Sequence, residues 1–172
     1  MANRAELLGL NEPFFETAQP ALHSLLEGNY GLPLLWLALY RKEDIREYEN
    51  VSILLTSRES ALASFDARRA GLETFLGAPA HPLVAQFRAV IEEHAYRYYL
   101  VNTTELQMLD DDFGAHLPGY FDQLDEIVAG TAQTRELPVL TQADDDLTHY
   151  PYDGKPLWLC GFSYEIEVPW DF

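Results

Sequence analysis

Two helix-like patterns joined by a short turn constrain the fold of this chain most. In the first, large apolar side chains recur at intervals typical of a helix, up to Gly77. Thr56 and Glu59 precede it in the spacing of a capping box, which satisfies free amides at a helix start. After the turn GAPAHP (77–82), Pro82 begins the second pattern. We therefore predict a helical hairpin over residues 57–94. Its inward side chains are Leu62, Phe65, Leu72, Phe75 and Leu76, followed by Leu83, Phe87, Val90, Ile91 and His94.

Segments typical of strands lie on both sides of this hairpin. Residues 51–57 (VSILLTS) are apolar and partly β-branched. Residues 96–106 (YRYYLVNTTEL) indicate a central strand buried on both sides, which ends at DDDFG (110–114). The string PLWLCGFSYEIEVPW (156–170) favours one or two further strands. We predict one domain over residues 1–172 with an α+β fold, a small mixed or antiparallel sheet covered by several helices.

Four other segments complete this prediction. Residues 5–10 fit either a short strand or the first turn of a helix, and residues 41–50 an exposed connection or frayed helix end. Pro20 begins a predicted helix that Gly28 ends, and Pro33 begins a helix, LPLLWLALY, buried at the centre of the core. Pro118 begins a last helix, closed by Gly130. The helix after Pro20 presents Leu22, Leu25 and Leu26, and the last turns Phe121, Leu124, Ile127 and Val128 inward.

The net charge excludes several classes of partner. The chain has 28 Asp and Glu against 11 Lys and Arg, a formal charge of −17. Such a field repels phosphate backbones, so we expect neither nucleic-acid binding nor adhesion to anionic membranes. The longest apolar run, Leu34 to Tyr40, is far below the roughly 20 residues that span a bilayer. The leucines near the N-terminus are interrupted by polar residues, which argues against a secretory signal, and we expect a cytoplasmic protein.

The acidic residues are concentrated toward the C-terminus. Residues 1–109, a helix-rich body, carry 9 basic and 14 acidic residues, whereas residues 110–172 carry 2 and 14. The latter region also holds 10 of the 22 aromatic residues. Aromatic anchors among carboxylates suit a surface that binds a basic protein, although acidic loops can also serve solubility alone and aromatic residues can belong to the core. The predicted partner-binding residues are Asp110, Asp111, Asp112, Asp122, Asp125, Glu126, Asp144, Asp145, Asp146, Tyr150, Tyr152 and Trp170.

Signals for chemistry are sparse. Each aspartate run is followed by a histidine, His116 or His149, and such groups can hold Mg²⁺, Ca²⁺ or Mn²⁺, although solvated acidic loops give the same pattern. Cys160 is the sole cysteine, so no intramolecular disulfide forms, and its apolar string LWLCGF favours a buried side chain over a Cys160–His149 pair. No G-x-S-x-G, Walker A or G-x-G-x-x-G motif occurs. We predict no catalytic residue, no metal ligand and no cofactor.

The opening Met1-Ala2-Asn3-Arg4, together with LPLLWLAL, ETFL and YYLVNTTELQML, resembles a family of uncharacterised bacterial proteins, a domain of unknown function. Its members open Met-Ala-Asn-Arg and have an aromatic strand that runs into a glutamate and a methionine, here Glu105 and Met108. The similarity covers about residues 1–130, although AELLGL replaces the family's Ser-Tyr-Leu-Tyr. The resemblance implies no activity or catalytic residue. Some such small acidic proteins look like immunity partners of bacterial toxins, which is an analogy.

Three functional hypotheses follow. The first is a non-catalytic acidic module that binds a basic protein, such as an immunity-type inhibitor of a secreted bacterial toxin. The second is a homodimeric scaffold that associates through exposed aromatic side chains. The third is a divalent-metal-dependent enzyme that uses the runs Asp110–Asp112 and Asp144–Asp146.

Overall fold

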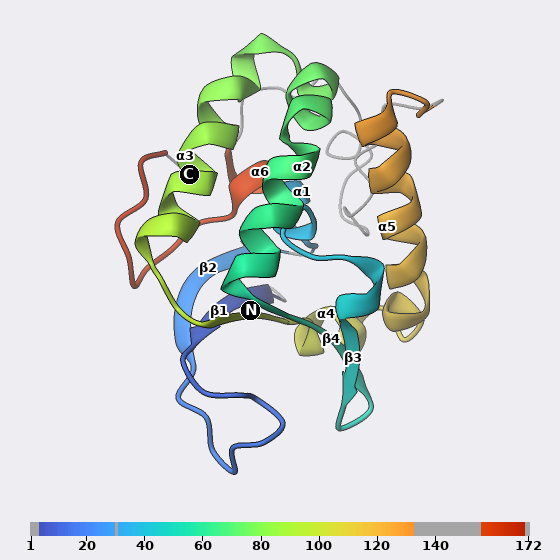
Figure 1. The fold of residues 1–172 in the computed structure, drawn as a ribbon. Coiled ribbons are helices and arrows are strands. Elements are labelled where there is room, and N and C mark those ends of the chain that lie inside the picture. Colours follow the sequence, from blue (N-terminus) through green and yellow to red (C-terminus); the bar gives the residue numbers. More distant parts are fainter. Residues whose placement is uncertain (1–3, 30, 133–155, 171–172) are drawn as a thin grey trace.

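A five-stranded antiparallel sheet, covered on one face by helices, forms the centre of the computed structural model (Figure 1), which describes residues 4–29, 31–132 and 156–170. The order across the sheet is β2-β1-β5-β4-β3. All four strand pairs are antiparallel. This architecture confirms the α+β prediction. The strands are β1 (Arg4–Leu10), β2 (His23–Asn29), β3 (Ile45–Tyr48), β4 (Val51–Ser57) and β5 (Tyr98–Asn102).

Three long helices lie on one side of the sheet, whereas the β1–β2 loop and the β3–β4 hairpin project from the other (Figure 1). The main core lies between the sheet and these helices, and a smaller apolar cluster of Leu8, Leu10, Ile53 and Leu100 occupies the opposite face. The long helices are α2 (Arg58–Leu76), α3 (His81–Glu93) and α5 (Phe113–Ala129). The short helices are α1 (Leu34–Leu37), α4 (Thr104–Leu109) and α6 (Pro156–Cys160), with 3₁₀ turns at Lys42–Asp44 and Ala78–Ala80.

The helical hairpin is confirmed, with a shift of one residue at its start. The N-cap of α2 is Ser57, whose hydroxyl oxygen accepts a hydrogen bond from the Ser60 amide at 3.2 Å. Thr56 instead stays in β4, paired with Tyr99 of β5. Gly77 ends α2 at a φ of 83°, a backbone region in which a side chain would be strained.

The helix predicted after Pro20 is wrong, because residues 23–29 form strand β2 beside β1. Leu26 pairs with Leu7, but Leu8 pairs with Ser24, so Leu25 is the extra residue of a bulge. Both Leu25 and Leu26 are buried in the main core. Two adjacent buried leucines break the alternation expected of a strand, and their spacing from Leu22 imitates a helix. Residues 4–10 take the strand alternative that the sequence left open.

The segment after Pro33 is buried throughout, as predicted, but its helix is only four residues long. Trp36 anchors it, since its indole Nε1 donates to the Cys160 carbonyl at 2.8 Å. Residues 41–50 are largely exposed, as expected, but the description as a connection or frayed helix end is wrong. They form a 3₁₀ turn and then strand β3 at the edge of the sheet.

The strand predicted over residues 96–106 is central, between β1 and β4, but extends only from Tyr98 to Asn102. The Asn102 side chain ends it, because its Oδ1 accepts hydrogen bonds from the Thr104 amide (3.1 Å) and hydroxyl (2.7 Å) and so begins α4. The predicted helix start at Pro118 is wrong, because α5 begins at Phe113, five residues earlier, and Pro118 lies inside it. As predicted, α5 turns Phe121, Leu124 and Ile127 inward and ends at Gly130, which has a φ of 71°.

The strands predicted over residues 156–170 are wrong. Pro156 begins α6, and the backbone that follows pairs with the sheet through a single bridge between Phe162 and Glu27. Gly161, which connects α6 to Phe162, has a φ of 78°, and a Cβ there would lie 2.6 Å from the Glu27 carbonyl oxygen. The segment therefore packs against β2 and α1 as a covering layer. No helix of the described ranges has the length and apolar character needed to cross a membrane.

Candidate protein-binding surfaces

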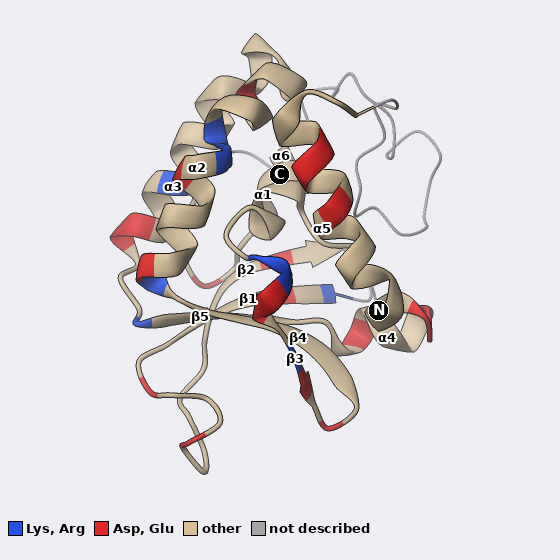
Figure 2. Ribbon diagram, turned by 45° about the vertical axis from the view of Figure 1, so that its right-hand side comes forward, with Lys and Arg blue, Asp and Glu red and all other residues tan. Residues whose placement is uncertain are grey.

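The predicted acidic residues gather along α5 and the turn before it, where Figure 2 shows a series of acidic segments. Asp111, Asp112, Asp122, Asp125 and Glu126 are all exposed. Asp144, Asp145, Asp146, Tyr150 and Tyr152 lie outside the described residues.

Trp170 is a correction, because it belongs to the core rather than to a binding surface. Its side chain is only 5% exposed and lies near the Phe87 ring, with 6.5 Å between the ring centroids. Its indole Nε1 donates to the Gly161 carbonyl at 2.9 Å. The indole therefore packs against α3 and offers almost no surface to a partner.

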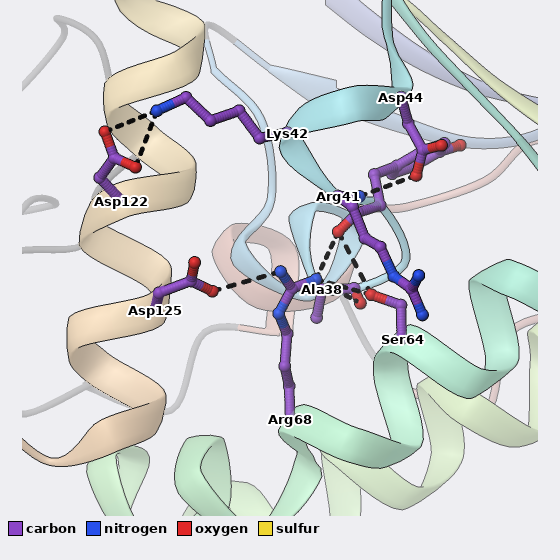
Figure 3. A network of polar contacts seen from close by, with 9 residues as sticks. Ala38, Arg41, Lys42, Asp44, Ser64, Arg68, Asp122 and Asp125 are labelled. Atoms are coloured by element: carbon purple, nitrogen blue, oxygen red, sulfur yellow. Dashed lines mark hydrogen bonds and ion pairs between the residues drawn. The ribbon is translucent and has the colours of Figure 1, made fainter.

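Two of the acids on α5 form internal ion pairs (Figure 3). Both carboxylate oxygens of Asp122 lie 2.9 Å from Lys42 Nζ, and Asp125 Oδ1 lies 3.3 Å from Arg68 Nη2. Arg68 also donates to the Ser64 hydroxyl at 2.6 Å and to the carbonyl oxygen of Tyr40. These contacts link α5 to α2 and to the chain that follows α1. Asp122 and Asp125 therefore have a structural role, and the carboxylates of Asp111, Asp112 and Glu126 have no ion-pair partner in the described part of the chain.

Most basic side chains are likewise engaged within the molecule. The described ranges hold nine of the 11 Lys and Arg, since Arg135 and Lys155 lie outside them. Arg46 and Arg58 donate to backbone carbonyls, and Arg97 lies over the Tyr98 ring. Little positive charge is thus left to offset the exposed carboxylates. Five of the nine form ion pairs with carboxylates: Arg4, Lys42, Arg68, Arg69 and Arg88.

The chemical groups singled out in the sequence do not form a site. His116 Nδ1 lies 3.8 Å from Asp110 Oδ2, but no set of three or more His, Cys, Asp or Glu side chains in the described ranges could hold a metal ion. Cys160 is fully buried, and burial raises the pKa of its thiol far above the ordinary range. The thiolate needed of a nucleophile is therefore strongly disfavoured, and His149 lies outside the described residues.

A second surface, which sequence reasoning missed, lies on the sheet face opposite the long helices. A cavity of about 310 Å³ opens there between the β1–β2 loop and the β3–β4 hairpin. Its floor is formed by Val51 and by three members of the smaller apolar cluster, Leu8, Ile53 and Leu100, and its polar lining comes from Asn102 and Thr104. Phe14 and Leu22 line it from the loop, and Tyr48 and Glu49 from the hairpin. We call this cavity and its rim the open-face groove.

Aromatic side chains connect the two walls of the open-face groove. The Phe14 ring lies edge-on to both Phe15 and Tyr48, with centroids 5.2 and 4.9 Å apart. Phe15, Leu22 and Tyr48 remain 53%, 46% and 43% exposed, among the most exposed large apolar side chains of the described residues. Apolar side chains gathered in this way commonly mark an interaction site. The signal in the sequence was the Phe14-Phe15 pair inside a loop that begins at Asn11.

The hairpin wall depends on an unusual turn. Tyr48 pairs with Val51, so Glu49 and Asn50 form a two-residue connection, and both have positive φ angles, 50° and 66°. Positive φ at both positions fits a type I′ turn, for which Asn and Gly are the preferred residues. A residue with a longer side chain than asparagine costs about 1–2 kcal/mol at such a positive φ. Glutamate is thus a poor residue for the turn, although it places a carboxylate at the rim of the groove.

Comparison with protein-family models, curated proteins and solved structures finds no match to this chain.

Proposed function

We propose that this protein is a non-catalytic acidic module that binds a basic protein, in the manner of an immunity-type inhibitor of a bacterial toxin. The observation that carries the proposal is the distribution of charge. The basic side chains are largely engaged in internal contacts, whereas Asp111, Asp112 and Glu126 are exposed and have no ion-pair partner in the described ranges.

Such a surface acts mainly on the rate of association. Summed over the chain, a charge of −17 attracts a basic protein over a distance that is limited by ionic screening. If the partner is a nuclease, surface carboxylates can occupy a cleft that is built to hold phosphate groups. Charge complementarity of this kind raises the association rate and excludes acidic partners. The proposed surface includes Asp144–Asp146, Tyr150 and Tyr152. We also propose that the chain is related to the family whose members open Met-Ala-Asn-Arg.

The test begins with affinity capture from the native host, followed by binding kinetics of the captured protein at several salt concentrations. We expect a basic partner whose association slows as salt rises. Glu126→Lys should slow it severalfold. Glu93→Lys is a matched control, because Glu93 is also exposed and lies in the last turn of its helix, α3. An acidic partner, or equal effects of the two variants and no dependence on salt, would refute the proposal.

Two alternatives have tests of their own. The exposed aromatic residues of the open-face groove are the feature that favours a homodimeric scaffold, and light scattering that finds a dimer would support it. Calorimetric titration with Mg²⁺, Mn²⁺ and Ca²⁺ tests the metal-dependent enzyme. A saturable site that is lost on substitution of Asp110–Asp112 or Asp144–Asp146 would favour that hypothesis.

A further inference from the structure

We propose that the open-face groove binds an apolar segment of a basic partner, a segment in which one or two bulky side chains are flanked by Lys or Arg. This inference rests on the proposed function, since it names the part of the partner that is recognised. It places the specific contact on the sheet face opposite α2, α3 and α5. The acidic surface along α5 then serves association over a distance.

The size and lining of the groove define the kind of occupant. Its volume of about 310 Å³ is at the lower end of the range for sites that enclose a small molecule. Most of its lining is apolar, from Leu8, Val51, Ile53 and Leu100 on the sheet. The polar atoms at one end are already satisfied, because Asn102 Nδ2 donates to Glu6 (3.0 Å) and its Oδ1 accepts from Thr104. The groove therefore suits apolar side chains rather than a ligand with many polar groups.

The exposed residues at the mouth are of the type that dominates protein interfaces. Tyr48 and Phe15 are aromatic, and each keeps about half of its side chain accessible. Their rings lie 6.3 Å apart and flank Phe14, which packs on the floor. Aromatic side chains held by neighbours lose little conformational entropy on binding, so they act as anchors.

The charge at the rim determines the partner's chemistry. Glu49 lines the groove, and the loop that forms the opposite wall carries Glu12 and Glu16. None of the three carboxylates has an ion-pair partner among the described residues. Figure 2 shows acidic segments on both walls. The arginines nearest in sequence are engaged, because Arg46 donates to the carbonyl of Ile45 and Arg97 lies over Tyr98.

A second copy of this chain fits the rim poorly. Two grooves placed face to face would bring the Glu49 carboxylates, and the loops that carry Glu12 and Glu16, toward their counterparts in the other copy, and like charges at an interface are unfavourable. Lys or Arg beside the apolar side chain would instead neutralise them. Glu49 also sits at a positive φ, where asparagine would be favoured. Residues kept in an unfavourable conformation commonly serve a function, here the supply of a carboxylate.

The test uses two synthetic peptides with blocked ends, Lys-Lys-Leu-Phe-Lys-Lys and Glu-Glu-Leu-Phe-Glu-Glu, titrated into protein with labelled methyl groups. The basic peptide should produce saturable NMR shifts at Leu8, Ile53 and Leu100. Methyls of the core under the helices, Leu72 and Ile91, are internal controls. The acidic peptide should produce no shift. The proposal is overturned if the groove methyls do not move, if both peptides act alike, or if these methyls shift with protein concentration alone, which would identify a second copy as the occupant.

Variants separate binding from folding. Tyr48→Ala should raise the dissociation constant of the basic peptide about tenfold. Glu49→Asn should raise it about threefold while leaving the denaturation midpoint unchanged or higher, because asparagine is better suited to the turn. Asn50→Gly in the same turn is the matched control and should bind as the wild type does. Equal binding by Glu49→Asn and Asn50→Gly would show that the rim charge has no role.

The two proposals fail in different ways. If the basic peptide binds the groove but the protein captured from the host is acidic, the groove is a binding site and the proposed function is wrong. If a basic protein is captured and its binding ignores both Tyr48→Ala and Glu49→Asn, the proposed function stands and the groove inference is wrong.

Discussion

Helices α2 and α5 approach so closely at Gly71 that a single added methyl group should separate them. A Cβ at this position would lie 2.4 Å from the carbonyl oxygen of Val128 and 2.6 Å from its Cα. Both are backbone atoms, so no side-chain rotation relieves the contact. Ordinary contacts of a Cβ begin at 3.4 Å, and the helices must therefore move apart by about 1 Å.

The magnitude for Gly71→Ala follows from two opposing effects. Alanine in place of glycine inside a helix adds about 1 kcal/mol of stability. Overpacking against a rigid neighbour costs about 1–3 kcal/mol, and here the upper part of that range applies because the neighbour is backbone. We expect Gly71→Ala to lower the free energy of unfolding by about 1–2 kcal/mol.

Gly119→Ala in α5 is the matched control, because a Cβ there would meet no atom within 4 Å. Without any packing cost, it should raise the free energy of unfolding by about 0.5–1 kcal/mol. Urea denaturation followed by far-ultraviolet circular dichroism measures both variants against the wild type. If Gly71→Ala proves as stable as Gly119→Ala, the close contact between α2 and α5 is wrong.

Three further predictions concern side chains in other parts of the molecule. Arg68→Met should lower the free energy of unfolding by about 1–3 kcal/mol, because the Tyr40 carbonyl loses the charged one of its two donors and keeps only the Ser64 hydroxyl at 3.3 Å. Asp125→Asn, at a side chain 67% exposed, should cost about 1 kcal/mol or less, and chemical denaturation would contradict this prediction if the order of the two variants were reversed. Cys160 should react with iodoacetamide only after urea unfolds the protein, and prompt labelling of the native protein would contradict its burial and raised thiol pKa. The hydrogen bond from Arg88 lowers the pKa of Asp66. This pair therefore contributes stability that is fully present above the ordinary aspartate pKa of about 4 and is lost as the pH falls through the lowered value. Arg88→Gln should reduce the loss of stability on acidification, and equal pH profiles for Arg88→Gln and the wild type would argue against the pair.

The sequence predicted the helical hairpin and strand β4 (51–57) correctly but missed strand β2, for a physical reason. The hairpin of α2 and α3 has regular apolar faces and glycine or proline at its ends, and both signals are local. The bulge opposite Leu7 and Leu8 buries Leu25 and Leu26 together, and it depends on pairing with β1, which lies outside the segment that contains the leucines. Local spacing contains no information about that pairing, so the leucines resembled one face of a helix.

The same limit applies to the candidate site. The outward direction of Asp122, Asp125 and Glu126 followed from helical periodicity, but the ion pairs that engage two of them involve Lys42 and Arg68 on other elements. The open-face groove joins β1, β4 and β5 with two loops, so no sequence window contains it. The turn Glu49-Asn50 was a local signal that could have located one wall.

The position of β5 in the sheet has a consequence for the way the protein is made. β1–β2 and β3–β4 are each formed from neighbouring segments, but the two pairs contact one another through β5, which is the last strand of the sheet to be synthesised. Until residue 102 has left the ribosome, the inner edges of β1 and β4 have no partner in the sheet, and unpaired edges are prone to aggregation. We expect nascent chains that end before β5 to depend on chaperones, and a short extension through Asn102 to let the sheet close.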